Sequence, residues 1–459
     1  MALESINPAT GERLDSYAEM SRDAVADAIR QTHEAFIGWR SRSFDERAQP
    51  MREAARLLRE RAELYGRLMA MEMGKPLKDG IAEAQKCTVC CEHFADHAAQ
   101  MLARETVPTE AHASFVAFNP LGVVLAVMPW NFPFWQVVRC AAPALMAGNA
   151  VALKHASNVP GCALALEELF REAGFPHSLM RALMIASGAV DAVIEHPLVR
   201  AVSVTGSVAT GRAVAAKAGA ALKKCVLELG GSDAYLVLED ADLEQAAAVC
   251  TKGRLVNSGQ SCIAAKRFIV VDAVREGFEQ RFVQRMQAAK VGDPLDMQTQ
   301  IGPMARRDLR DALHDQVQRS VQKGARCLFG GKVPDGPGAF YRPTVLTDVK
   351  RGMPAFDEEL FGPVAAIIPV KDEAHAIATA NDSSFGLGGA VLTRDLARGE
   401  RIAAEEMECG CVFVNDAVRS DPRLPFGGVK DSGYGRELSA YGLREFVNIK
   451  TVWVAPRNH

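Results

Sequence analysis

Residues 202–211 read VSVTGSVATG, an apolar run that passes through a Gly-Ser turn into a segment compatible with a helix. A strand, a glycine turn and a helix form one unit of an α/β fold, and the backbone amides at such a helix start can hold a phosphate group. The turn lacks the G-x-G-x-x-G pattern of the common dinucleotide fold, and no Gly-Lys-Ser/Thr follows it as in a P-loop. Taken alone, it is at least equally compatible with an ordinary strand-to-helix turn.

Apolar runs of strand length recur on both sides of this unit. The first set covers residues 122–128, 150–154 and 200–204, with helix-length segments such as 163–172 between them. This alternation predicts a parallel, doubly wound sheet. The second set covers residues 234–238, 267–271 and 411–415. Because it follows a break at Gly230-Gly231, it predicts a second α/β domain.

Two other features concern the ends of the chain. Apolar residues at three- and four-residue spacing predict amphipathic helices over 21–39, after Ser21, and over 45–72. Strand-like runs at 112–118 and 447–454 are far apart in sequence, and they are free to pair with each other or with another subunit.

Composition excludes several classes of protein. A chain of 459 residues is longer than one core usually holds, so we expect two or three domains. The 53 basic and 56 acidic residues are scattered without a basic stripe, which argues against nucleic acid as a partner. The 11 cysteines lack the paired spacing of a zinc site, so we expect reduced thiols, no metal and a cytoplasmic location. We expect no signal peptide and no membrane span, because no segment has about 18 uninterrupted apolar residues.

Three further segments carry groups with useful chemistry. Residues 257–262 (NSGQSC) place Cys262 after small, turn-forming residues, which suits a nucleophile, although most lone cysteines are buried small hydrophobes. Residues 228–232 (ELGGS) place Glu228 where an apolar strand ends; it is a candidate general base or a solvated strand-end carboxylate. Residues 128–133 (MPWNFP) hold Asn131 between two prolines, either as an oxyanion donor or as a residue that closes a turn.

These four segments, in this order, resemble the aldehyde dehydrogenase family. Further matches are KHAS at 154–157, ELFGPV at 359–364 and PFGGVKDSGYGRE at 425–437. The resemblance covers nearly the whole chain. It implies an aldehyde dehydrogenase-like α/β fold with two doubly wound parallel domains and a small β oligomerisation element. The implied parts are a cofactor-binding domain at 1–104 and 124–230, a catalytic domain at 231–431, and a bridging element at 105–123 and 432–459. Homodimers or homotetramers are usual in that family.

The resemblance also implies the roles of the site residues. Cys262 would attack the aldehyde, Asn131 and the Cys262 backbone N–H would hold the oxyanion, and Glu228 would activate the water that hydrolyses the thioester. The implied cofactor contacts are Trp130, Lys154, Ser157, Gly206, Ser207, Leu229, Glu359 and Phe361. NADP or NAD is the expected cofactor. Ser157 stands where a glutamate often repels the 2′-phosphate of NADP, and Lys154 can pair with that phosphate.

Within the family the sequence is most like bacterial succinate-semialdehyde dehydrogenases. That likeness implies that Arg139 and Ser420 bind the distal carboxylate of the substrate. One departure is Val256, which stands where some members carry a second carboxylate-binding arginine; Arg419 or Arg423 are open as substitutes. The alternatives are oxidation of another semialdehyde or aliphatic aldehyde, or a non-catalytic scaffold of the same fold. Ala264 replaces the second cysteine of members that form a redox disulfide beside the nucleophile, so no such switch is expected.

Overall fold

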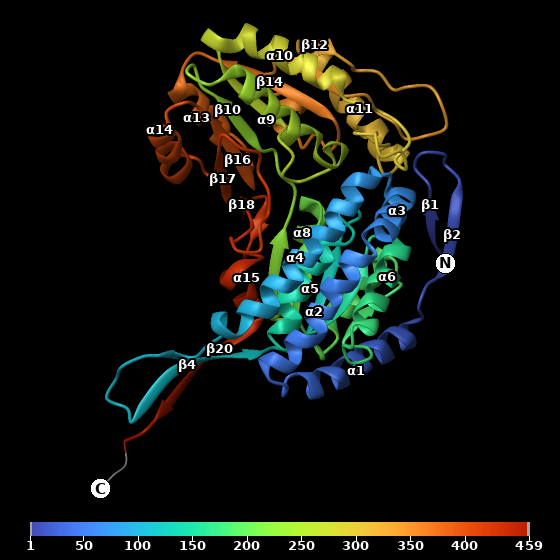
Figure 1. Cartoon of the computed structure of the whole chain (residues 1–459), viewed down its shortest axis with the longest axis vertical. Coiled ribbons are helices and arrows are strands. Elements are labelled where there is room, and N and C mark those ends of the chain that lie inside the picture. The colour runs from blue at the N-terminus through green and yellow to red at the C-terminus, as the bar shows by residue number, and fades with distance from the viewer. Residues whose placement is uncertain (1, 457–459) are drawn as a thin grey trace.

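The structure, a computed structural model, describes residues 2–456. Two large sheets covered by helices form its two main bodies, and a narrow β-arm projects from one of them (Figure 1). The predicted α/β class is confirmed. Among the helices within residues 2–456, none is long and apolar enough to cross a membrane.

The first sheet has six strands in the order β19-β9-β8-β5-β6-β7. They are β5 (Val123–Met128), β6 (Ala150–His155), β7 (Met180–Ala182), β8 (Val199–Thr205), β9 (Lys224–Glu228) and β19 (Gly433–Tyr434). Strands β5 to β9 are parallel, as predicted, and β19 is antiparallel to β9. The chain adds β6 on one side of β5 and β8 on the other, so the topology switches between β5 and β8. A ligand crevice is expected at the carboxyl ends of these strands.

The helices between residues 22 and 220 pack around this sheet and against one another. They are α1 (Arg22–Trp39), α2 (Phe44–Glu60), α3 (Ala62–Met73), α4 (Leu77–Met101), α5 (Trp135–Met146), α6 (Pro160–Glu172), α7 (Val190–Glu195) and α8 (Val208–Ala220). The prediction that α1 begins after Ser21 is confirmed, because the Ser21 side chain accepts a hydrogen bond from the Ala24 amide. The single helix predicted over 45–72 is wrong. The chain leaves helical geometry at Arg61, and this turn lets α2 and α3 both pack against α4.

The second sheet has seven strands in the order β12-β13-β14-β11-β10-β16-β17, and only β12 is antiparallel to its neighbour. The three predicted strands are β10 (Ala234–Val237), β11 (Arg267–Val271) and β17 (Cys411–Val414). The other four strands were not predicted: β12 (Arg326–Phe329), β13 (Thr344–Thr347), β14 (Val364–Val370) and β16 (Gly388–Leu392). The helices of this part are α9 (Leu243–Leu255), α10 (Arg275–Ala288), α11 (Arg307–Gln322), α12 (Pro354–Asp357), α13 (Glu373–Asn381) and α14 (Leu396–Arg401).

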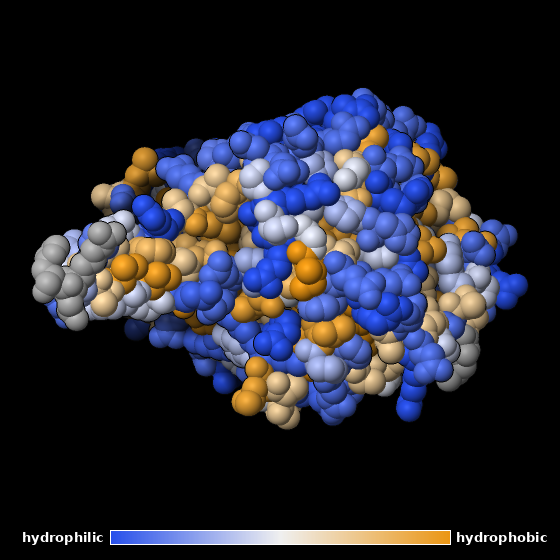
Figure 2. Space-filling view, turned by 90° about the horizontal axis from the view of Figure 1, so that it is seen from below, coloured by the Kyte–Doolittle hydropathy of each residue, from blue (hydrophilic) through white to orange (hydrophobic). Residues whose placement is uncertain are grey.

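The β-arm pairs the two remote strands of the sequence analysis with each other. Strand β4 (Ala113–Pro120) runs antiparallel to β20 (Val447–Val454), and β3 (Glu105–Thr106) pairs with the other edge of β4. The predicted bridging segment 432–459 contributes β19 to the first sheet before it forms α15 (Ser439–Glu445) and β20. Figure 2 shows apolar side chains along the projecting arm, where Ile449 is 61% exposed and Trp453 is 49% exposed.

Two small two-stranded sheets complete the strands of the described chain. Strands β1 (Ala2–Ile6) and β2 (Arg13–Ala18) form a hairpin near the N-terminus, and β15 (Phe385–Gly386) pairs antiparallel with the remote β18 (Val429–Lys430). The Ala339 amide donates to the Pro8 carbonyl at 2.8 Å, which ties the N-terminal hairpin region to the second body.

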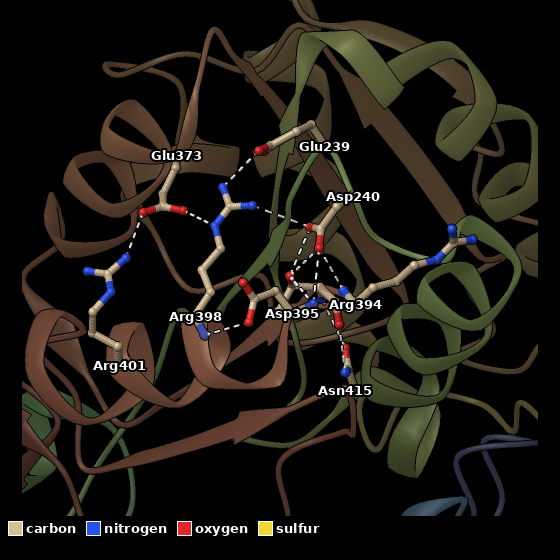
Figure 3. Close-up of polar contacts among 9 residues, drawn as sticks. Glu239, Asp240, Glu373, Arg394, Asp395, Arg398, Arg401 and Asn415 are labelled. Atoms are coloured by element: carbon tan, nitrogen blue, oxygen red, sulfur yellow. Dashed lines mark hydrogen bonds and ion pairs between the residues drawn. The ribbon is translucent and has the colours of Figure 1, made fainter.

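A group of ion pairs fastens α13 and α14 to the end of β10 (Figure 3). We call it the surface charge cluster, and it comprises Glu239, Asp240, Glu373, Arg394, Asp395, Arg398, Arg401 and Asn415. Arg398 pairs with Glu373, and its guanidinium also lies 2.9 Å from Glu239 and 3.5 Å from Asp240. Each of these carboxylates therefore faces a cation, and the cluster joins segments from different parts of the chain.

Candidate active site

Cys262 follows a turn that glycine makes possible. After α9, Asn257, Ser258 and Gly259 all adopt positive φ angles of 52°, 56° and 77°. A Cβ atom on Gly259 would lie 2.4 Å from the Gly362 carbonyl, so no side chain fits at this position. The turn is thus pressed against the 359–364 segment. It directs Cys262, which is partly exposed, toward a cavity.

Hydrogen bonds hold this turn against the segment that carries Asn131. The Asn257 side-chain Nδ2 donates to the backbone carbonyl of Asn131 at 2.7 Å, and the Asn131 Nδ2 donates to the backbone carbonyl of Gln260 at 3.0 Å. Gln136 Nε2 donates to Asn131 Oδ1 at 3.1 Å, which sets the amide so that its NH2 group faces the turn. Because an NH2 group has two protons, Asn131 keeps one donor for an oxygen in the cavity. The geometry fits the predicted oxyanion donor, whose role stays a prediction.

The Cys262 thiol needs help to ionise. Burial raises its pKa to about 12, while the positive charges of Lys266 and Arg139 act to lower it. Lys266 is buried, and its Nζ donates to the Ser261 carbonyl at 2.8 Å and to the Cys262 carbonyl at 2.6 Å. It therefore fixes the backbone of the nucleophile and places a cation beside the thiol.

Glu228 ends β9 as a buried carboxyl without a partner. The residue is 2% exposed, and within the described residues neither of its carboxylate oxygens has a hydrogen-bond partner. Burial raises its pKa well above the ordinary 4.5; Arg139 opposes this rise and Glu437 adds to it. An unsatisfied buried carboxyl costs stability, so its presence asks for a functional explanation. A raised pKa also gives the carboxylate the basicity needed to activate water.

Arg139 lies behind the cavity and is already paired. It is 2% exposed, forms an ion pair with Glu437, and donates to Thr205 Oγ1 at 3.3 Å. Its guanidinium carbon also lies 4.8 Å from the centre of the Phe426 ring. The structure therefore gives Arg139 a counter-ion inside the protein, and direct contact with a substrate carboxylate stays a prediction. We call Cys262, Glu228, Arg139 and Glu437 the buried charge cluster.

One cavity of about 260 Å³ brings most of the predicted site residues together. Its lining includes Cys262 and Asn131, and six of the predicted cofactor contacts: Trp130, Gly206, Ser207, Leu229, Glu359 and Phe361. The Glu359 carboxylate accepts the Gly231 amide at 2.9 Å, and Phe361 meets the Trp130 ring edge-on with centroids 5.7 Å apart. We call this space the first cavity.

The first cavity has two features that suit a dinucleotide. The start of α8 offers backbone N–H donors, and glycine allows α8 to approach the strand end closely. Ser207 caps α8 by accepting the Thr210 amide, so the positive helix end faces the switch between β5 and β8. A Cβ on Gly211 would lie 2.4 Å from Leu229, which shows how closely α8 approaches the strand end. Lys154 is the penultimate residue of β6; it is 8% exposed, and across residues 2–456 no ion pair engages it. Ser157 follows β6 and is exposed.

A second cavity of about 450 Å³ opens on the other side of the Asn131–Asn257 contact. Its lining is Lys78, Asp79, Ala82, Glu83, Lys86, Phe132, Trp135, Thr251, Lys252, Leu255, Val256, Asn257 and Gln300. Ser420 reaches its edge, because Lys86 Nζ donates to Ser420 Oγ at 2.7 Å. The two cavities share no lining residue. Arg423 pairs with Asp421 and Arg419 with Asp416, so both candidate substitutes for an arginine at position 256 have partners.

Sequence reasoning missed several residues of the site. Gln136, Glu437, Lys266 and Lys86 make the contacts described above, yet none was predicted. The sequence could have indicated Lys86. Asp79, Glu83 and Lys86 lie at four- and three-residue spacing, and these charged residues therefore share one face of α4. Within residues 2–456 no group of His, Cys, Asp and Glu could hold a metal ion.

Comparison with known proteins relates this geometry to characterised enzymes. The aldehyde dehydrogenase family matches residues 1–452. A succinate semialdehyde dehydrogenase [NAD(P)+] of Escherichia coli K12 is 47% identical over 98% of this chain and 97% of its own. A probable succinate-semialdehyde dehydrogenase [NADP(+)] of Synechocystis is 48% identical over 99% of this chain and 100% of its own. The crystal structure of succinic semialdehyde dehydrogenase from Streptococcus pyogenes with NADP+ superposes with a TM-score of 0.97 at 36% identity, covering 99% of this chain and 100% of that one.

Proposed function

The chain belongs to the aldehyde dehydrogenase family, and from this premise we propose that it oxidises succinate semialdehyde to succinate with NADP or NAD. The observation that carries the proposal is the first cavity, where the cysteine nucleophile and the amide donor share one lining with the dinucleotide contacts. The unpartnered Glu228 in the same cluster supports it.

In the acylation half, we propose that the Cys262 thiolate attacks the aldehyde carbon. The thiol proton passes to Glu228, the basic group of the buried charge cluster. The free N–H of the Asn131 amide and the Cys262 backbone N–H stabilise the oxyanion of the thiohemiacetal. When bound, the dinucleotide supplies the acceptor for the two electrons and the hydrogen that leave the aldehyde carbon, and a thioester on Cys262 remains.

In the hydrolysis half, Glu228 first releases the thiol proton to solvent. It then takes a proton from water, and the resulting hydroxide attacks the thioester carbonyl. The C–S bond breaks, the thiolate is restored, and the acid leaves as its carboxylate. The reaction consumes one aldehyde, one water and one oxidised cofactor, and it yields one carboxylate, one reduced cofactor and two protons. The raised pKa of Glu228 supports this role, since it marks a carboxylate with high affinity for a proton.

We propose that the dinucleotide is held by Trp130, Gly206, Ser207, Leu229, Glu359 and Phe361 in the first cavity, with Lys154 and Ser157 at its ribose end. The Lys154 ammonium is buried without an ion-pair partner in the described chain, and burial lowers its pKa. A 2′-phosphate would supply the missing counter-charge, and Ser157 adds no repulsion. NADP should therefore be accepted as well as NAD.

We propose that Ser420 binds the distal carboxylate directly, since it reaches the edge of the second cavity through its bond to Lys86. For Arg139 we propose a contribution to this specificity through its charge, since its guanidinium is paired with Glu437.

We propose the domain boundaries 1–104 with 124–230, 231–431, and 105–123 with 432–459. The projecting β-arm supports assembly into a homodimer or homotetramer, because Ile449 and Trp453 would otherwise stay exposed. Size-exclusion chromatography with light scattering tests this assembly. A cytoplasmic location is supported by the 11 cysteines, all of which are free thiols.

The test of the reaction follows absorbance of the reduced cofactor with succinate semialdehyde, glutarate semialdehyde and propanal, each with NADP and NAD. We expect kcat/KM to be highest for succinate semialdehyde. Equal kcat/KM for propanal would contradict the carboxylate-specific proposal, and no turnover of any aldehyde would favour a scaffold.

A further inference from the structure

The second cavity contains a lysine whose position the proposed reaction does not yet explain. Lys86 extends from α4, and its Nζ reaches Ser420 Oγ at 2.7 Å across 334 residues of sequence. The same Nζ lies 4.1 Å from the centre of the Trp135 ring on α5. Two separate contacts thus hold the ammonium at the cavity wall.

Lys86 and Ser420 keep hydrogen-bond donors that their mutual contact does not engage. An ammonium has three N–H groups, and the Ser420 bond takes one of them. The Ser420 hydroxyl accepts that bond, so its own proton is available to a further acceptor. Lys86 and Ser420 together therefore offer several N–H and O–H donors and one positive charge, which is the set that a carboxylate requires.

Four other charged residues line the wall. Lys78 and Asp79 are sequence neighbours of opposite charge, so together they add no net charge to it. Glu83 forms an ion pair with Lys75 and accepts the amides of Phe134 and Trp135, each at 2.9 Å. Lys252 has a side chain that is 72% exposed and lies 3.7 Å from Asp416. Val256, which also lines the cavity, is neutral.

Lys86 also lacks a compensating anion. Burial, and next the charge of Arg139, lower its pKa to about 8. Across residues 2–456 it forms no ion pair, so a carboxylate bound beside it would stabilise its charged form.

We propose that Lys86 is the specificity-determining cation of this site and that, with the Ser420 hydroxyl, it directly binds the distal carboxylate of the substrate. This inference rests on the proposed oxidation of succinate semialdehyde. It assigns the direct contact with the carboxylate to Lys86 of α4. Arg139 stays paired with Glu437 and makes no direct contact with the substrate.

The experiment compares the wild type with Lys86→Met, using succinate semialdehyde and butanal, which has four carbons but no carboxylate. For succinate semialdehyde we expect Lys86→Met to raise KM about 10- to 100-fold, as for loss of a charged hydrogen bond, with kcat changed less than about 3-fold. For butanal we expect KM to stay the same or to fall. Lys86→Arg should recover part of the loss, because it restores the cation.

Lys252→Met is the matched control, since it removes an exposed lysine from the same cavity, and its KM for succinate semialdehyde should change less than about 3-fold. Dinucleotide binding in the first cavity, measured by fluorescence, verifies that each variant is folded. An unchanged KM for succinate semialdehyde in folded Lys86→Met, or an equal rise for both aldehydes, would overturn the inference alone. If the wild type itself fails to distinguish the two aldehydes, the proposed function fails first and the inference falls with it.

Discussion

The buried charge cluster and the surface charge cluster both place carboxylates near arginines, but the carboxylate pKa values shift in opposite directions. In the surface cluster, Asp240 accepts both Thr393 Oγ1, at 2.8 Å, and the Arg394 amide, at 3.0 Å. Burial alone would raise the Asp240 pKa, but these hydrogen bonds outweigh it and the pKa is lowered. In the buried cluster, Glu228 has no such donors among the described residues, and its pKa is raised. A carboxylate that accepts hydrogen bonds stabilises the fold. A buried carboxylate without donors costs stability and therefore indicates a functional role.

The largest expected effect is in the buried cluster, where Cys262→Ala removes the nucleophile. Oxidation should fall by about 10⁴-fold or more, because the covalent route is lost. Binding of the dinucleotide should persist, since the other residues of the first cavity remain. Turnover assays and a binding titration measure the two effects. Substantial residual oxidation would show that Cys262 is not the nucleophile.

Glu228→Gln should come next, with a loss of about 10³-fold in turnover from the missing general base. If the slow step is hydrolysis, rapid mixing should show a burst of reduced cofactor equal to the number of active sites. The substitution also removes an unpaired buried acid, so stability to urea should stay the same or rise. Equal loss of burst and turnover would show that acceptance of the thiol proton is the limiting role of Glu228, and unchanged turnover would contradict both of its proposed roles. Reduced stability would contradict the comparison.

Glu437→Gln should mainly affect folding. It leaves the Arg139 charge buried without its counter-ion, which costs about 3 kcal/mol when one partner of a buried pair is removed. Urea unfolding of the variant and the wild type measures the difference. A loss of unfolding free energy below about 1 kcal/mol is typical of exposed ion pairs. It would show that the Arg139–Glu437 pair contributes no more than a pair of the surface charge cluster.

The smallest effect is expected for Asp240→Asn in the surface cluster, about 0.5–1 kcal/mol near pH 7 with unchanged activity. The folded-state pKa of Asp240 lies below its ordinary 3.8, so this stabilisation is present above pH 3.8 and is lost as pH falls through the lowered pKa. Glu228 has the opposite sign, because its raised pKa makes the wild type lose stability as pH rises above 4.5. Urea unfolding of Asp240→Asn and Glu228→Gln against the wild type at several pH values should therefore give opposite trends. Parallel trends would contradict the difference between the clusters.

Local patterns predicted the parts of the molecule that depend on neighbouring residues. The run at 202–207 became β8 and the turn before α8, and the periodicity of 21–39 became α1. The break at Arg61 had no glycine or proline to mark it, because it results from the packing of α2 and α3 against α4. The pairing of β4 with β20 was one of two options, since strands far apart in sequence carry no record of their partner.

The residues of the site also fall into two groups, those that local patterns predict and those that depend on tertiary packing. Cys262, Asn131 and Glu228 lie in short segments whose turns and strand ends could be recognised from the chain. Lys86 and Ser420 meet across 334 residues, and such a contact depends on how whole elements pack. Arg139 shows the limit most clearly. Its predicted role as a ligand of the distal carboxylate stays a prediction, and its pairing with Glu437, 298 residues away in sequence, was not predicted.

The contact between Asn257 and the Asn131 backbone separates the two cavities, which have no lining residue in common. Under the proposed reaction, the dinucleotide binds in the first cavity, which Cys262 lines, and the distal carboxylate of the aldehyde binds at the second. An inhibitor that joins a nicotinamide mimic to a carboxylic acid would therefore have to span the hydrogen-bonded contact between Asn131 and Asn257. Linker length would then be the main variable in its design, and small fragments for each side could be optimised independently before they are joined.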